Sequence, residues 1–216
     1  MTCAICGIRK PRRFCPAVNG AICSICCGTG REETIDCPLE CEYLQDAHDH
    51  EPLEPTDPAT IPNSDLDLPD SFLEDNDALL VVLGSAVVEG ARVSPGITDY
   101  DLREAFDSLA RTYRTLQSGL HYETVPVNPY AAGVCEAVQG RIAELRKAAA
   151  RAADGSMLTD STVFGAMVVL QRLEYMHNNR RRRSRAFLDL LSRTYVPLPP
   201  DLSEMGPPPE EPRIIL

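Results

Sequence analysis

The chain has 216 residues, of which 44% are hydrophobic and only 6% aromatic, with no tryptophan. This composition allows a small domain beside one of about 100–150 residues, and it leaves few aromatic side chains for stacking on nucleic-acid bases. The net charge of −11 disfavours non-specific binding to nucleic acid, although it does not exclude a local basic surface.

Neither a signal segment nor a membrane span is predicted. The N-terminal residues contain no apolar stretch of the signal-peptide kind. The longest apolar run, residues 78–88, is interrupted by Gly84 and Ser85. It is far shorter than the roughly 18–20 residues that a membrane span needs. We therefore expect a cytoplasmic protein with reduced thiols and no membrane partner.

Charge divides the chain into regions of different character. Residues 1–31 carry +5, residues 32–78 carry −16, and residues 79–216 are neutral. This asymmetry, together with the positions of cysteine and proline, predicts four segments. They are a zinc-binding module (1–48), an acidic proline-rich linker (49–70), a helical bundle (71–196) and a proline-rich tail (197–216).

Eight of the nine cysteines lie in the first 41 residues. They are Cys3, Cys6, Cys15, Cys23, Cys26, Cys27, Cys37 and Cys41. In a reducing compartment such a cluster indicates metal binding rather than a disulfide framework. Eight thiolates match two tetrahedral four-cysteine zinc sites, so the sequence predicts two Zn²⁺ ions.

The cysteine spacings predict two kinds of ligand pair. Cys3-Ala-Ile-Cys6, followed by a glycine, is typical of a zinc knuckle, and Cys23-Ser-Ile-Cys26 repeats that spacing. Cys37-Pro-Leu-Glu-Cys41 is different, because proline suits the first position of a helix. Residues four apart share a helical face, so we expect both of these thiolates on the first turn.

Our preferred assignment interleaves the two sites along the chain. One ion is held by Cys3, Cys6, Cys23 and Cys26, and the other by Cys15, Cys27, Cys37 and Cys41. Cys26 and Cys27 could exchange roles, and His48 or His50 could replace a cysteine. An iron–sulfur cluster or redox-active thiols are the alternatives to zinc. Eight thiolates for two ions leave no open position, which favours structural over catalytic zinc.

The paired thiols and the helix that carries the last ligands resemble cross-braced, treble-clef-like zinc fingers of the MYND and HIT kind. The resemblance covers only the head, and Cys15 departs from it by having no close cysteine partner. It implies a protein-interaction module. The whole chain also resembles uncharacterised bacterial proteins with a cysteine-rich head and a helical body, which implies no function.

Two basic clusters are candidate contacts for nucleic acid or a protein partner. The first is Arg9, Lys10, Arg12 and Arg13, between zinc ligands, and the second is Arg180, Arg181, Arg182 and Arg183. The first cluster could instead compensate the negative charge of the thiolate sites. The second could be a solvated helix entry, or it could pair with the acidic segment.

The rest of the chain predicts a bundle of about five helices, which makes the fold class mainly α. We expect them near residues 71–91, from Thr98 through Leu120, from Asn128 through Ala149, from Asp160 to His177, and from Ser184 to Tyr195. Their apolar residues recur at spacings of three and four, as on one face of a helix. Thr98 with Asp101 resembles a capping box.

No phosphate loop, dinucleotide fingerprint, metalloprotease motif or nucleophile elbow occurs in the sequence, so we predict no catalytic residue. The leading hypothesis is a zinc-binding, non-enzymatic adaptor or regulator that acts through protein–protein interaction. The first alternative is a regulator that binds nucleic acid through the two basic clusters. The second is an enzyme with a pocket in the helical body, near His121, Glu123 or Cys135.

Overall fold

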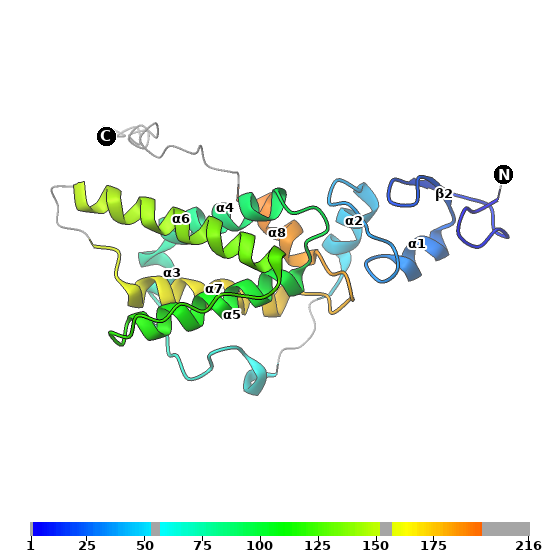
Figure 1. The fold of residues 1–216 in the computed structure, drawn as a ribbon. Helices are drawn as coiled ribbons and strands as arrows, with labels where there is room; N and C mark the ends of the chain where they lie inside the picture. Colours follow the sequence, from blue (N-terminus) through cyan, green and yellow to red (C-terminus); the bar gives the residue numbers. More distant parts are fainter. Residues whose placement is uncertain (1, 53–56, 152–156, 196–216) are drawn as a thin grey trace, which may run out of the picture.

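The computed structural model describes residues 2–52, 57–151 and 157–195. The predicted tail, 197–216, lies outside the described residues. The chain is mainly helical, as the sequence predicted. Figure 1 shows the cysteine-rich head at one end of the molecule, with the N-terminus at its tip and the helical body at the other end.

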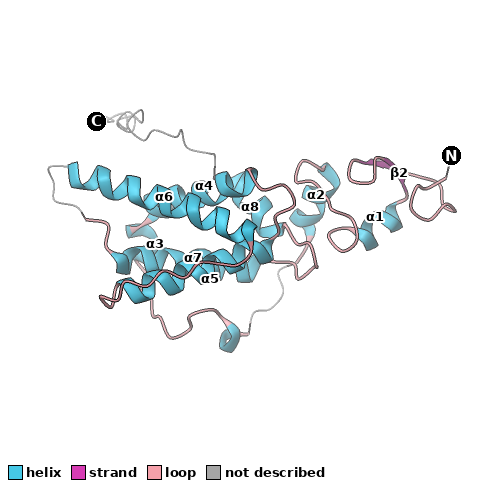
Figure 2. Ribbon diagram, viewed as in Figure 1, coloured by secondary structure: helices cyan, strands magenta, loops and turns pink. Residues whose placement is uncertain are grey.

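The head consists of short elements joined by turns. A two-stranded antiparallel hairpin, β1 (Arg13–Cys15) and β2 (Gly20–Ile22), was not predicted. Helix α1 (Ser24–Gly30) follows directly, and α2 (Glu42–His50) ends the head (Figure 2). Apart from cysteines, its buried apolar side chains are Ile22, Ile35 and Leu44. Three such side chains are too few for an apolar core of ordinary size, so the head depends on its thiols.

The body consists of six helices in the described residues. They are α3 (Phe72–Asp75), α4 (Asp77–Arg92), α5 (Asp99–Leu116), α6 (Pro129–Arg151), α7 (Asp160–His177) and α8 (Ala186–Thr194). Helix α5 packs against α6 and α7, while α4 packs against α6, α7 and α8. The last five correspond to the five predicted helices.

The predicted apolar stripes face one continuous core. Leu102, Phe106 and Leu109 of α5 are buried there with Val138 of α6 and Met167 of α7. The ring of Phe106 meets that of Phe187 edge to face, with centroids 6.1 Å apart. The three-and-four spacing of apolar residues therefore identified the buried faces of these helices correctly, because burial favours apolar residues along one face of a helix.

Several predicted helix boundaries were wrong. The helix expected over 71–91 is broken at Asn76, whose side-chain amide donates to the Phe72 carbonyl and ends α3. The helix expected to reach Leu120 ends at Leu116, and Leu120 is exposed because the chain leaves the helix before Gly119, which has φ +79°. A glycine in this left-handed conformation is a common helix terminator.

Helix caps stabilise the start of α5 and connect α5 to α8. Thr98 and Asp101 form the predicted capping box at the start of α5. The fifth predicted helix starts at Ala186 rather than Ser184, and its cap comes from Asp99 of α5. The Asp99 carboxylate accepts hydrogen bonds from the backbone N–H groups of Phe187 and Leu188, each at 3.0 Å. A carboxylate at a helix N-terminus stabilises that helix.

The acidic segment after the head lies along the body. Residues 58–60 form a single 3₁₀ turn, η1 (Pro58–Thr60). Arg172 of α7 donates to the carbonyls of Pro62, Asn63 and Leu66 at 2.7–3.2 Å. None of the described helices combines the length and the apolarity that crossing a lipid bilayer requires.

Candidate metal centre

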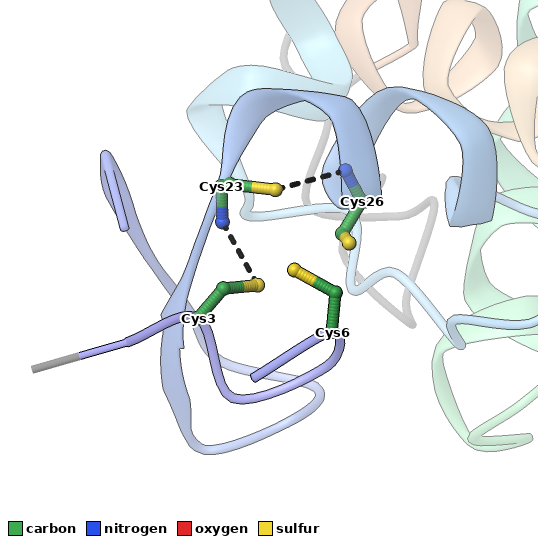
Figure 3. A group of neighbouring side chains, drawn as sticks. All are labelled: Cys3, Cys6, Cys23 and Cys26. Carbon is green, nitrogen blue, oxygen red and sulfur yellow. Dashed lines mark hydrogen bonds between the residues drawn. The ribbon is translucent and has the colours of Figure 1, made fainter. Parts of the chain in front are cut away.

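Four cysteines of the head converge on one point, as the sequence predicted. The sulfur atoms of Cys3, Cys6, Cys23 and Cys26 all lie within 4.8 Å of one another (Figure 3). A tetrahedral zinc ion with Zn–S bonds of about 2.3 Å would place its ligands about 3.8 Å apart. The quartet therefore fits a zinc ion after only small adjustments.

Local backbone geometry explains why these thiols meet. Gly7 has φ +65° and its N–H donates to the Cys3 carbonyl, which closes the turn between Cys3 and Cys6. Cys23 occupies the N-cap of α1, where its sulfur accepts the Cys26 N–H at 3.4 Å. The Cys23 N–H in turn donates to the Cys3 sulfur at 3.2 Å, which links the two pairs (Figure 3).

The surroundings favour negative charge on two sulfurs of the quartet, those of Cys3 and Cys6, whereas a hydrogen bond with Cys23, together with burial, raises the pKa of Cys26 to about 12. Hydrogen bonding from the Cys6 backbone N–H lowers the pKa of Cys3 to about 6. The backbone N–H groups of Arg9 and Ile8 lower the pKa of Cys6. The Arg9 side chain bonds to Cys23, and that bond raises its own pKa. A zinc ion binds thiolates, so these contacts prepare the site for metal.

The other four cysteines line a single small cavity. Cys15, Cys27, Cys37 and Cys41 surround a volume of about 10 Å³, close to the space of one water-sized sphere. Burial raises the pKa of Cys37 to about 11, and the nearby charges of Cys41 and Cys15 act in the same direction. In the described part of the chain, however, only the first quartet has its ligand atoms within 4.8 Å of one another.

The expectation that Cys37 and Cys41 share the first turn of a helix was wrong. Helix α2 begins at Glu42, with Cys41 at its N-cap in an extended conformation. Cys37 precedes the helix in a turn, in which the Cys41 N–H donates to the Pro38 carbonyl. The Leu39 carbonyl accepts from the Gln45 side chain at 2.8 Å, so it is not available for a helical bond.

Neither histidine near the cysteines belongs to the quartet. His50 is exposed, and its Nδ1 lies 2.7 Å from the Asp46 carbonyl. His48 is buried between two carboxylates, with Nδ1 2.8 Å from Asp189 and Nε2 3.1 Å from Glu32. The alternative in which one of them replaces a cysteine in that quartet is therefore excluded.

The two basic clusters have different surroundings. In the first, Arg9 and Arg13 lie against thiols: Arg13 Nη1 is 3.8 Å from the Cys27 sulfur, and its guanidinium stacks on the Tyr43 ring at 4.2 Å. Lys10 and Arg12 are exposed. These contacts favour charge compensation for two of the four residues.

The second cluster lies at the junction of head and body. Arg181 donates to the Arg31 carbonyl at 3.1 Å and to Glu51 at 2.8 Å. The Arg183 N–H donates to the Glu32 carbonyl at 2.7 Å. Arg180 stacks on the Tyr175 ring, and Arg182 is exposed. The predicted pairing with the acidic segment is therefore observed for Arg181, and for Arg183 through Asp36 at 3.9 Å.

Sequence reasoning missed the polar core of this junction. Glu32, His48 and Asp189 are each at most 3% exposed in their side chains. Burial opposes a charge on His48, but hydrogen bonds to Asp189 and Glu32 raise its pKa to about 9. The three residues are far apart in the chain, so their spacing carries no signal. Only the unusual richness of the 32–51 segment in acids pointed toward it.

The three residues considered for an enzyme do not all lie in one groove. His121 and Glu123 line a groove beside α5 and α6, where Glu123 accepts from Gln139 at 2.7 Å. Cys135 is not among the residues that line it, and burial raises the pKa of its thiol to about 12. A protonated, buried thiol is a poor nucleophile.

No protein-family model matches the chain, and no curated protein or solved structure is significantly similar to it. No comparison therefore supports the expected resemblance of the head to MYND and HIT fingers. What the geometry of the head shows is a four-cysteine cluster compatible with zinc.

Proposed function

We propose that this protein is a non-enzymatic adaptor whose head is a structural two-zinc module that binds a protein partner. The observation that carries the proposal is the closed Cys3–Cys6–Cys23–Cys26 quartet, which supplies four thiolates to one ion. A site of this kind has no open coordination position for a substrate or an activated water molecule. Such a site stabilises the shape of a protein surface and catalyses no reaction.

The second ion would occupy the cavity between the remaining four cysteines of the head. Its size suits a single ion, and Arg13 supplies a cation next to Cys27. Residues 1–48 carry five basic and six acidic side chains, and each occupied four-thiolate site adds a charge of about −2. Because the head would then carry a net negative charge, this count favours a protein partner over nucleic acid.

The head also exposes apolar side chains next to its metal ligands. Ile8 is 84% exposed and Phe14 60%, while Ile5 and Ile25 are exposed at matching positions of the two knuckles. Exposed apolar groups held on a rigid module are typical of protein-interaction sites. Metal binding would maintain their positions.

The test compares proteins captured from a native lysate by the zinc-loaded chain and by an Ile8→Glu, Phe14→Glu variant. The control is Val127→Glu, which adds a carboxylate at a body position that is 98% exposed. We expect the control to retain the captured proteins and the head variant to lose them while keeping its zinc. Identical capture by all three would contradict the role of the head.

Binding to nucleic acid is the outcome that would replace this proposal. It would appear as binding to short mixed-sequence DNA or RNA that weakens steeply with salt. It would also be lost when the exposed Lys10, Arg12 and Arg182 are changed to glutamine. We expect no such binding at physiological salt.

A further inference from the structure

Two cysteines of the second set, Cys37 and Cys41, lie where the head meets the body, whereas the first set lies within the head. We propose that an ion held by Cys15, Cys27, Cys37 and Cys41 fixes the head on the helical body, so that metal binding and docking stabilise each other. The inference rests on the two-zinc head proposed above. It adds a role for the second ion that differs from that of the first.

Cys37 is attached to the body through its own backbone. The Arg185 guanidinium donates to the Cys37 carbonyl at 2.5 Å and to the Asp36 carboxylate at 2.7 Å. Its Nε donates to the Ile97 carbonyl at 2.9 Å. Arg185 is only 7% exposed, so its bonds to the two carbonyls form away from solvent, where they are stronger, whereas Asp36 is half-exposed. One buried side chain thus joins a zinc ligand to two segments of the body.

Glu32 provides a second connection. Its backbone N–H bonds to the Cys37 sulfur, and its carboxylate accepts the Arg185 N–H at 2.6 Å and the Asn179 amide at 2.7 Å. Its carbonyl accepts the Arg183 N–H. A shift of Cys37 therefore displaces a fully buried carboxylate that has several partners, and losing such partners is costly.

Cys41 is linked to the body through α2. This helix begins directly after Cys41 and carries His48, which bridges Glu32 and Asp189. At the same end, Asp49 pairs with Arg193 of α8 at 2.6 Å. Both Cys37 and Cys41 are therefore positioned by contacts between the head and the body.

The first quartet has no such connection. In the described residues, the hydrogen bonds of Cys3, Cys6, Cys23 and Cys26 go to other residues of the head. The first quartet is also already compact, whereas the second must draw its sulfurs together around an ion. That closure involves Cys37 and Cys41, and so the second site alone is coupled to docking. Such coupling acts equally in both directions.

The decisive experiment compares two single-ligand variants of the full-length chain, Cys15→Ser and Cys3→Ser. Cys15 lies in β1, away from the interface, so its loss removes the second ion without touching a docking contact. The readout is hydrogen exchange at the Arg183 and Arg185 amides, which donate to Glu32. We expect exchange to be faster by on the order of tenfold in Cys15→Ser and unchanged in Cys3→Ser.

The reciprocal measurement changes the body and reads the metal. Arg185→Gln should weaken the second zinc by on the order of tenfold in competition with a chromophoric chelator, and leave the first unchanged. Arg181→Gln, which breaks a partly buried contact to Glu51, should act in the same direction if Arg185→Gln does not fold. Arg114→Gln is the matched control, because Arg114 pairs with Asp65 away from the head.

Metal counts separate the two levels of the proposal. A wild-type protein that binds one ion would overturn the two-zinc head and this inference with it. Two ions in the wild type and one in Cys15→Ser, with equal amide exchange in both, would overturn only the coupling. Faster exchange in both cysteine variants would also overturn it, because the first ion would then serve docking as well.

Discussion

The head and the body are stabilised by different interactions. The body buries a continuous apolar core supplied by five helices, whereas the head buries mainly thiols around three apolar side chains. An apolar core needs no ligand, but clustered thiolates repel one another unless a cation lies between them. If the head holds the ions proposed above, the fold combines a metal-dependent part with a metal-independent one, joined by a buried polar interface.

Removal of the metal should produce the largest difference in stability between the head and the body. Structural zinc contributes apparent free energies of about 10–16 kcal/mol in small fingers, which the head cannot replace with apolar burial. A strong chelator should therefore unfold the head and leave α5, α6 and α7 folded. Two-dimensional NMR spectra would show collapsed signals for the head and dispersed signals for the body.

Readdition of zinc provides the control, since it should restore the signals of the head. A body that unfolds together with the head would contradict the division into two parts. So would a head that keeps its signals without metal.

A substitution in the apolar core should destabilise the body and leave the metal sites of the head unchanged. Phe106 is fully buried against Phe187, so Phe106→Ala should lower the free energy of unfolding of the body by about 3–5 kcal/mol. Urea unfolding followed by circular dichroism would measure the change. Because no metal ligand is involved, the zinc content should stay the same in buffer, and a loss of zinc would contradict the separation.

The junction should respond to pH through His48. Its pKa is raised to about 9 from an ordinary value of 6.5, so its contribution is fully present below pH 6.5 and is lost as pH rises through about 9. The groups that face it are Glu32 and Asp189, and Arg193 also pairs with Asp189 at 2.8 Å. With zinc saturating, we expect stability to fall by about 2 kcal/mol between pH 6 and 9.5.

His48→Gln is the matched variant for the pH measurement, since it retains hydrogen-bonding capacity without a charge that titrates in this range. Its unfolding free energy should depend less on pH over the same interval. An equal slope in both proteins would assign the pH dependence to another group. The carboxylate of Glu32 does not interfere, because its pKa is lowered and its contribution disappears only toward acidic pH.

The sequence was informative where a pattern is local. The spacing of Cys3 to Cys6, the capping box at Thr98 and the stripes of α5 to α8 all depend on residues within a turn or two, and each was found in the structure. The first quartet was also predicted, although its two pairs lie seventeen residues or more apart, because two identical knuckles are a strong signal.

Contacts between distant segments could not be predicted in the same way. Asp99 caps a helix that begins at Ala186, and His48 joins Glu32 to Asp189. Neither arrangement follows from a period or a spacing, because tertiary packing alone brings the partners together. The turn at Cys37 was mistaken for helix for the same reason, since its carbonyl is taken by Arg185 from the body.

The smallest effect is expected where the acidic segment lies on the body. Arg172 holds this segment through three carbonyl groups, those of Pro62, Asn63 and Leu66. Arg172→Gln would leave a shorter side chain that cannot reach all three, so we expect a loss of about 1 kcal/mol. Hydrogen exchange should become faster in residues 57–70, while the zinc content and the exchange of the Arg185 amide stay unchanged. If the Arg185 amide also exchanged faster, the acidic segment would itself help to dock the head, and the junction would extend beyond the contacts of Glu32, His48 and Arg185.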